Sequence, residues 1–266
     1  MTRVLVIGNS HSAAIRIAWN GLAEQFPQIE MRFFVAGGNA FRCFDLDDRG
    51  IFRCVTESAV SKDDLQRIRL QNDGLSTDCN WADHVLLIGR NYGEVTVARI
   101  ARQWDIDGFP GSGSRQRLSR SAFDAFCEYV AKAHLPDRTW GKLTGKVTVA
   151  GAPYPSSSLE EASLFLGAAR PWKALLEDPA GFAEVSGVHD LFFAGALGQH
   201  GLHFAPQPVA SRTALGFTRP EYVRVAPDKH MRNGVPVDDF RHMNEAYGRL
   251  RLLAYLADFV GATLPS

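Results

Sequence analysis

Hydrophobic residues gather in short runs along the chain, and each of four such runs ends beside glycine or another small residue. The runs lie at residues 3–7, 31–35, 84–88 and 146–150. Apolar runs of this length are typical of strands that are buried on both faces of a sheet. The pattern therefore predicts four strands in the interior of the protein.

Helical periodicity appears between these runs and after them. From residue 11 to residue 25, Ile15, Trp19 and Leu22 recur on one helical face. Similar periods predict helices over 118–133 and 243–260, and a helical segment over 159–176 that Pro171 kinks or splits. Strands that alternate with helices predict an α/β fold, a three-layer α/β/α sandwich around a mostly parallel sheet, with chemistry at the carboxyl ends of the strands.

The whole chain of 266 residues is expected to form one domain with a sizeable core. Two segments, at about 41–80 and 195–237, lack both periods and are rich in Gly, Pro, Asp and Arg. We expect them to be irregular excursions from the domain surface. Long connections of this kind often serve as lids or binding loops.

Composition and charge restrict the partners. The 29 basic residues are balanced by 29 acidic ones, which argues against binding to a nucleic acid backbone. No apolar stretch approaches the roughly 18 residues of a membrane span, and the first apolar run is too short for a signal peptide. The four cysteines show no zinc-type spacing. A Cys43–Cys54 bridge would require an oxidising compartment, so we expect reduced thiols in a cytoplasmic protein.

The first candidate for chemistry is the segment Gly8-Asn9-Ser10-His11, between the first strand and the first helix. A serine there would hold its hydroxyl above the sheet edge, near the positive end of the helix dipole. These conditions suit a nucleophile that carries developing oxyanion charge. The alternative is that Asn9 or Ser10 caps the helix. His11 would then either contact a substrate or face the neighbours of the first helix.

The second candidate is the segment Asp239-Phe240-Arg241-His242, directly before the terminal helix. In a helical or turn geometry, Asp239 and His242 lie on the same side and can form a hydrogen bond. A carboxylate that orients an imidazole supports a general base. The alternative is an aspartate at the helix N-terminus beside a solvated histidine.

Two further candidates follow the second and third strands. Gly37 and Gly38 follow the second strand, and Asn91 lies within Gly89–Gly93 after the third. A backbone N–H and a side-chain amide at neighbouring strand ends could point at one oxygen near Ser10 and form an oxyanion hole. The alternative is that these residues only form turns.

Weaker signals have simpler interpretations. The spacing of His189, His200 and His203 could hold a metal, but we expect solvated loop histidines and no metal. The segment 111–115 lacks the lysine of a phosphate loop and is expected to be a flexible turn. A group of aromatic and arginine side chains could stack on a sugar and bind its hydroxyls, or could pack the excursions onto the body. This group comprises Phe41, Arg42, Phe44, Arg49, Trp81, Arg90 and Tyr92.

The order of the four candidate segments resembles that of the SGNH (GDSL-like) hydrolase superfamily. The resemblance spans Gly8 to His242: a G-[DN]-S block, a glycine after the second strand, a G-x-N block and a D-x-x-H block before the C-terminal helix. His242-Met243-Asn244 is similar to the D-x-x-H-[LM]-N ending of the family. Asn9 replaces the usual aspartate beside the serine, and Tyr92 stands where an acidic residue is common.

This resemblance implies a flavodoxin-like sandwich in which Ser10 is the nucleophile, His242 the base and Asp239 its orienter. It also implies an oxyanion hole made by the N–H groups of Ser10 and of Gly37 or Gly38, together with the Asn91 amide. We expect Asn9, His11, Arg90 and Tyr92 to contact the substrate.

The function that follows is a serine ester hydrolase without a cofactor, acting on short-chain acyl esters, such as acetyl esters, of a carbohydrate or small molecule. An acyltransferase that moves an acetyl group onto a glycan is one alternative. A non-catalytic module that binds a glycan is another, although such a module would not need Ser10, Asp239 and His242 together.

Overall fold

Five parallel strands form the central sheet of the protein. The computed structural model describes residues 1–37, 40–143, 145–157, 170–224, 230–232, 235–237 and 242–264. The sheet order is β10-β9-β6-β1-β2, and every neighbouring pair is parallel. The strands are β1 (Thr2–Gly8), β2 (Ile29–Val35), β6 (His84–Arg90), β9 (Val147–Gly151) and β10 (His203–Ala205).

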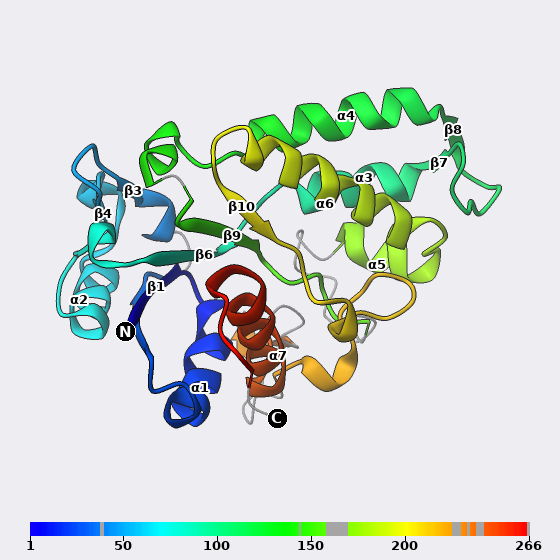
Figure 1. Ribbon diagram of the computed structural model, residues 1–266. Coiled ribbons are helices and arrows are strands. Elements are labelled where there is room, and N and C mark those ends of the chain that lie inside the picture. Colours follow the sequence, from blue (N-terminus) through cyan, green and yellow to red (C-terminus); the bar gives the residue numbers. More distant parts are fainter. Residues whose placement is uncertain are drawn as a thin grey trace.

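Helices cover both faces of this sheet (Figure 1). On one face α1 (Ser12–Leu22) packs against α7 (Glu245–Tyr255), and both helices continue in short turns, Ala23–Gln25 and Leu256–Val260. The opposite face carries α3 (Glu94–Gln103), α4 (Arg120–Ala133), α5 (Arg170–Glu177) and α6 (Phe182–Gly198). The prediction of a three-layer α/β/α sandwich is therefore confirmed.

The apolar run of β1 serves both layers. Val4 and Val6 join the hydrophobic cluster beneath α1 and α7, whereas Leu5 and Ile7 join the cluster beneath the other helices. Successive side chains of a strand point to opposite faces, so a continuous apolar run fills two cores. The four predicted strands are confirmed as β1, β2, β6 and β9.

The sequence pattern did not predict one strand of the central sheet, β10, and two of the helices on its opposite face, α3 and α6. The strand β10 has only three residues, too few for a periodic signal. The helix α3 begins shortly after β6 ends. The helix α6 has His189 and Asp190 on its buried face, so the apolar stripe of α6 is interrupted. The predicted helix at 159–176 is described only from residue 170 onward, as α5, and the rest of it lies outside the described residues.

The expectation of irregular excursions was wrong for most of residues 41–80. This segment contains α2 (Lys62–Asn72) and an antiparallel sheet of β3 (Phe44–Leu46), β4 (Ile51–Cys54) and β5 (Ser76–Asp78). The helix was missed because Ile68 is its one buried residue. Other short strands are the parallel pair β7 (Trp104–Ile106) and β8 (Gln116–Leu118) and the antiparallel pair β11 (His230–Arg232) and β12 (Val235–Val237).

A glycine lets α7 approach α1 closely. A Cβ atom on Gly248 would lie 2.0 Å from the carbonyl oxygen of Ala14, so any side chain there would push the two helices apart. Since α1 follows Ser10 and α7 follows His242, this contact brings the two most distant candidate segments of the sequence to the same side of the sheet.

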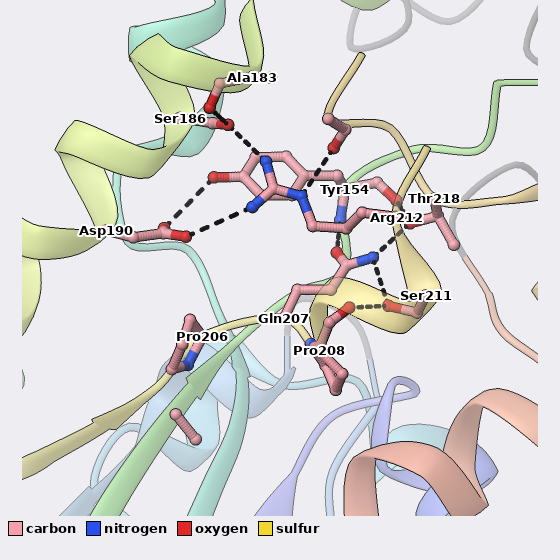
Figure 2. Close-up of polar contacts among 12 residues, drawn as sticks. Tyr154, Ala183, Ser186, Asp190, Pro206, Gln207, Pro208, Ser211, Arg212 and Thr218 are labelled. Carbon is pink, nitrogen blue, oxygen red and sulfur yellow. Dashed lines mark hydrogen bonds and ion pairs between the residues drawn. The ribbon is translucent and has the colours of Figure 1, made fainter. Parts of the chain in front are cut away.

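A buried glutamine fixes the chain that follows β10 (Figure 2). The Gln207 side chain accepts a hydrogen bond from the N–H of Tyr154 at 2.8 Å. Its amide donates to Thr218 at 2.9 Å and to Ser211 at 3.1 Å. These contacts tie residues 207–218 to the segment after β9, because buried amide groups that are fully paired favour one arrangement of the chain.

An ionic cluster lies beside this glutamine (Figure 2). Arg212 Nη1 lies 3.9 Å from a carboxylate oxygen of Asp190, and the guanidinium also donates to Ser186 at 2.5 Å. It stacks over the ring of Tyr154, whose hydroxyl donates to Asp190 at 3.3 Å. Burial raises the pKa of Asp190 from 3.8 to about 6, an effect that Arg212 only partly offsets.

The pKa of the neighbouring residue, His189, is shifted in the direction opposite to that of Asp190. Its ring is fully buried and its Nε2–H donates to the carbonyl of Tyr92 at 2.8 Å. Burial lowers the pKa of His189 from 6.5 to about 4. Asp190 therefore contributes stability that is lost as the pH rises from about 4 through 6, whereas His189 contributes stability that is lost as the pH falls from 6.5 through 4.

We expect the pH-dependent contributions of Asp190 and His189 to the free energy of unfolding to offset one another in the wild type. Substituting either residue should therefore reveal the contribution of the other. The free energy of unfolding of Asp190→Asn should fall more steeply than that of the wild type as the pH is lowered from 6.5 to 4, because the His189 contribution is then unopposed. That of His189→Gln should fall as the pH is raised from 4 to 6. Urea unfolding at several pH values measures both, and parallel curves for the three proteins would contradict the assignment.

Candidate active site

A cavity lies at the edge of the sheet where the strand order reverses. From β1 the chain crosses first to β2 on one side and then to β6 on the other. When the five strands are counted in chain order, their order in the sheet is 2-1-3-4-5. In sheets of this order, ligands bind outside the carboxyl ends of the first and third strands, which here are β1 and β6. A cavity of about 570 Å³ occupies this place. Its lining residues are Asn9, Ser10, His11, Phe41, Arg42, Phe44, Asp45, Phe52, Gly89, Arg90, Asn91, Glu94, Val95, Ala152 and His242.

Ser10 and His242 meet in this cavity. His242 Nε2 lies 2.7 Å from Ser10 Oγ, although 232 positions separate the two residues in the sequence. Ser10 occupies the exposed turn between β1 and α1, and His242 precedes α7. A base within 2.6–3.2 Å of a hydroxyl can accept its proton. The pair therefore has the geometry of a nucleophile and its general base.

The position of His242 is fixed through its backbone and its ring. Its carbonyl accepts a hydrogen bond from Arg224 N–H at 3.0 Å. Two residues later, Asn244 N–H donates a hydrogen bond to the Tyr222 carbonyl at 2.9 Å. The side chain of Asn244 caps α7. The imidazole stacks on the ring of His11, with centroids 5.4 Å apart. The chain at His242 and directly after it is thus anchored, which limits movement of the imidazole relative to Ser10.

Asn9 joins the ends of two strands. Its Nδ2 donates to the carbonyl of Gly89 at 2.8 Å, and its Oδ1 accepts from His11 N–H at 3.1 Å. Gly89 adopts φ +81°, and a Cβ there would lie 2.2 Å from Asn9 Oδ1. An amide offers both the donor and the acceptor that this bridge needs, whereas a carboxylate offers acceptors alone. Asn9 lines the cavity, but its polar atoms hold the turn around Ser10.

The alternative of simple helix caps is not met at either end. The N-cap of α1 is His11, whose side chain does not cap the helix, and Ser10 Oγ faces His242 instead. The cap of α7 is Asn244, not Asp239. Asp239 itself lies outside the described residues, so its predicted contact with His242 stays a prediction.

Asn91 presents an unused donor to the cavity. Gly89 stands in a β-bulge of β6, where the register with β9 shifts, and bulges re-aim the side chains beside them. The Oδ1 of Asn91 accepts from Gly93 N–H at 2.8 Å, which leaves Nδ2 free to donate. Neither this Nδ2 nor the backbone N–H of Ser10 donates a hydrogen bond to the described part of the chain. Both groups are available to an oxyanion.

The predicted glycine donor is not placed at the cavity. Gly37 is exposed after β2 and is not among the lining residues. Gly38 lies outside the described residues. The structure therefore brings together two of the three predicted donors, and the glycine contribution stays a prediction.

Tyr92 is buried beneath the cavity instead of facing it. Its side chain is 2% exposed, and its ring stacks on His189 and contacts Phe193 and Phe204. Burial raises the pKa of Tyr92 well above its usual value. The prediction that Tyr92 contacts a substrate was therefore wrong. Its neighbour Arg90 does line the cavity.

The other aromatic and arginine side chains divide between cavity and scaffold. Phe41, Arg42 and Phe44 line the cavity. Trp81 is not among the lining residues, and its ring is covered by the guanidinium of Arg32, 3.9 Å from the ring centroid. Arg49 also lies away from the lining, where its carbonyl accepts a hydrogen bond from the side chain of Asn80. Packing of the excursion onto the body thus accounts for part of this group.

Sequence analysis missed Asp45 and Glu94, which also line the cavity. Glu94 is the first residue of α3 and is 2% exposed, and its carboxylate accepts from Tyr92 N–H at 3.0 Å. A glutamate in the first turn after Gly93 is a recognisable helix-start signal. Asp45 gave no such signal, because its position depends on the small sheet that covers this side of the cavity.

The described residues contain no cluster of three or more His, Cys, Asp or Glu side chains that could hold a metal ion. The expectation of solvated loop histidines was wrong for His189, which is buried on α6.

Within the described ranges, none of the helices is both long and apolar enough to cross a membrane. Comparisons of the chain with family models, with curated proteins and with solved structures found no match.

Proposed function

We propose that this protein is a serine ester hydrolase of the SGNH type that acts through an acyl-serine intermediate. The proposal rests on one observation above all, the 2.7 Å contact between Ser10 Oγ and His242 Nε2 in a cavity of about 570 Å³. The four segments of the SGNH resemblance support it, since three of them contribute residues to this cavity.

In the first half of the reaction, His242 Nε2 takes the proton of Ser10 as Oγ bonds to the ester carbonyl carbon. The carbonyl electrons move to the oxygen, which accepts hydrogen bonds from Ser10 N–H and Asn91 Nδ2. When the tetrahedral intermediate collapses, the bond to the alcohol breaks and His242 protonates the leaving oxygen. Water then attacks the acyl-serine by the same route and restores Ser10. Asp239 would stabilise the imidazolium.

The proposed substrate is a short-chain acyl ester, such as an acetyl ester, of a carbohydrate or small molecule. The cavity supports this class because its lining combines phenylalanine rings with charged and amide side chains. No cofactor is needed for the steps above. We further propose that the protein acts in the cytoplasm, in agreement with its four free cysteines.

A fluorophosphonate probe tests the nucleophile. We expect it to label Ser10 and no other serine, as mapped by mass spectrometry, because the probe needs a hydroxyl beside a base and an oxyanion hole. Hydrolysis of acetyl, butyryl and octanoyl nitrophenyl esters by the same preparation measures the preferred acyl length. Labelling of a different serine, or no labelling and no hydrolysis, would reject the mechanism.

The oxyanion donor gives a separate prediction. Replacing Asn91 with alanine should lower kcat for an activated acetyl ester by about 10²–10³-fold, because the amide would bind the transition state better than the ground state. Asn20→Ala, at an exposed position of α1, is the matched control and should retain wild-type kcat. A change of less than threefold in the Asn91 variant would exclude this side chain from the oxyanion hole.

A further inference from the structure

Arg90 carries a charge for which the described residues supply no direct partner. It follows Gly89 at the end of β6, is partly buried and lines the cavity beside Asn91. Its side chain makes no hydrogen bond, ion pair or ring contact with any residue in the described part of the chain. Withdrawing a charged group from water without pairing it is unfavourable. A ligand that supplies the missing contact would remove this penalty.

The carboxylates around Arg90 do not fill that role. Burial lowers the pKa of Arg90, and the negative charges of Asp45 and Asp137 offset only part of this effect. One carboxylate oxygen of Asp45 accepts a hydrogen bond from Leu46 N–H at 2.8 Å, and Asp137 accepts hydrogen bonds from the N–H and the hydroxyl of Thr139. An arginine keeps its proton in proteins, so this residue of the cavity lining remains positively charged.

The sign of the unmet charge indicates the sign of the ligand. The carboxylates of Asp45 and Glu94, which line the cavity, each accept a hydrogen bond from a backbone N–H. In contrast, the side chains of Arg90 and Arg42 make no hydrogen bond or ion pair within the described ranges. A planar guanidinium matches a carboxylate with two parallel hydrogen bonds. The buried rings of Phe41 and Phe44 also line the cavity, and apolar surroundings strengthen such a pair.

We propose that Arg90 binds a carboxylate of the substrate, so that the preferred substrate carries a negative charge in addition to the ester bond that is cleaved. This inference rests on the proposed function and deepens it. Arg90 acts through binding and takes no part in proton transfer, because the base and the oxyanion donors are other groups.

Two pairs of esters test the proposal and locate the charge. In 4-nitrophenyl hydrogen succinate the carboxylate belongs to the acyl group, and 4-nitrophenyl methyl succinate is its neutral match. In 4-acetoxybenzoate it belongs to the leaving group, and methyl 4-acetoxybenzoate is the neutral match. We expect kcat/KM to favour the anionic member of at least one pair by about tenfold or more, the scale of a hydrogen bond to a charged group. Equal values within both pairs would overturn the proposal.

Substitution of the arginine should remove this preference through KM. Arg90→Gln should equalise the two members of the favoured pair, and Arg90→Lys should keep part of the preference because it keeps the charge but loses the planar fork. Arg99→Gln, at an exposed position of α3, makes the same change of charge away from the cavity and should keep the full preference. A full, wild-type preference in Arg90→Gln would overturn the assignment, and so would a full preference in Arg90→Lys, which serves alone if the glutamine variant does not fold.

Binding without turnover separates this inference from the proposed function. Calorimetry should show that Ser10→Ala binds monomethyl succinate more tightly than dimethyl succinate. The double variant Ser10→Ala, Arg90→Lys should lose most of that difference in affinity. If the difference appears while the wild type hydrolyses no ester, the anion site stands and the esterase proposal fails. If the wild type hydrolyses esters and neither assay shows a preference for the anion, the esterase proposal stands and this inference fails.

Discussion

Replacing Ser10 with alanine is expected to lower kcat for 4-nitrophenyl acetate by about 10⁴-fold or more. The substitution removes the oxygen that lies 2.7 Å from His242 Nε2, and no other hydroxyl lines the cavity among the described residues. The residual rate would come from the oxyanion donors and from binding alone. Initial rates of nitrophenol release by the purified variant give the measurement.

The fold of this variant should be unaffected. Ser10 is exposed, and its only side-chain hydrogen bond in the described structure is the one to His242, so the melting temperature should stay close to that of the wild type. Ser114→Ala, in the exposed turn between β7 and β8, is the matched control and should keep full activity. If Ser10→Ala retained wild-type rates, the acyl-serine mechanism would have to be abandoned.

The second large effect concerns the base. His242→Ala should also lower kcat by about 10⁴-fold, because the Ser10 hydroxyl then loses the group that accepts its proton. The same substitution leaves a space in the cavity wall where the imidazole stood. Free imidazole added to the variant should therefore raise the rate in a concentration-dependent way, as a diffusible base that replaces the lost side chain.

Rescue distinguishes a base from a packing residue. A variant that had lost activity because α7 moved away from α1 would not recover with imidazole, and its melting temperature would fall. His200→Ala, at an exposed position after α6, should behave as the wild type does. Wild-type activity in His242→Ala would remove this residue from the mechanism.

The fold could be predicted wherever a strand was long and buried on both faces. The runs that became β1, β2, β6 and β9 are five to seven residues long, and each supplies side chains to a core. The elements that escaped prediction either are short, as β10 is, or hold polar groups on their buried face, as α6 does at His189 and Asp190. Pattern reasoning assumes that polar residues face water, and buried polar networks break that assumption.

The candidate site could be predicted as far as strand ends determine it. The carboxyl ends of parallel strands meet at one edge, which was enough to expect Ser10 and Asn91 in the same place. Side-chain direction was beyond such reasoning. Asn91 lines the cavity whereas Tyr92, the next residue, is buried, because the turn after the bulge at Gly89 directs neighbouring side chains to opposite sides. The unpartnered state of Arg90 likewise depends on contacts that no linear pattern records.

The meeting of Ser10 and His242 has a consequence during protein synthesis. A ribosome that adds about 5–20 residues per second needs on the order of 10–50 s to pass from codon 10 to codon 242. Throughout that interval the nascent polypeptide carries the serine without the imidazole. Under the proposed mechanism, an incomplete chain would therefore be inert toward esters, and the serine would gain its base only when α7 packs against α1.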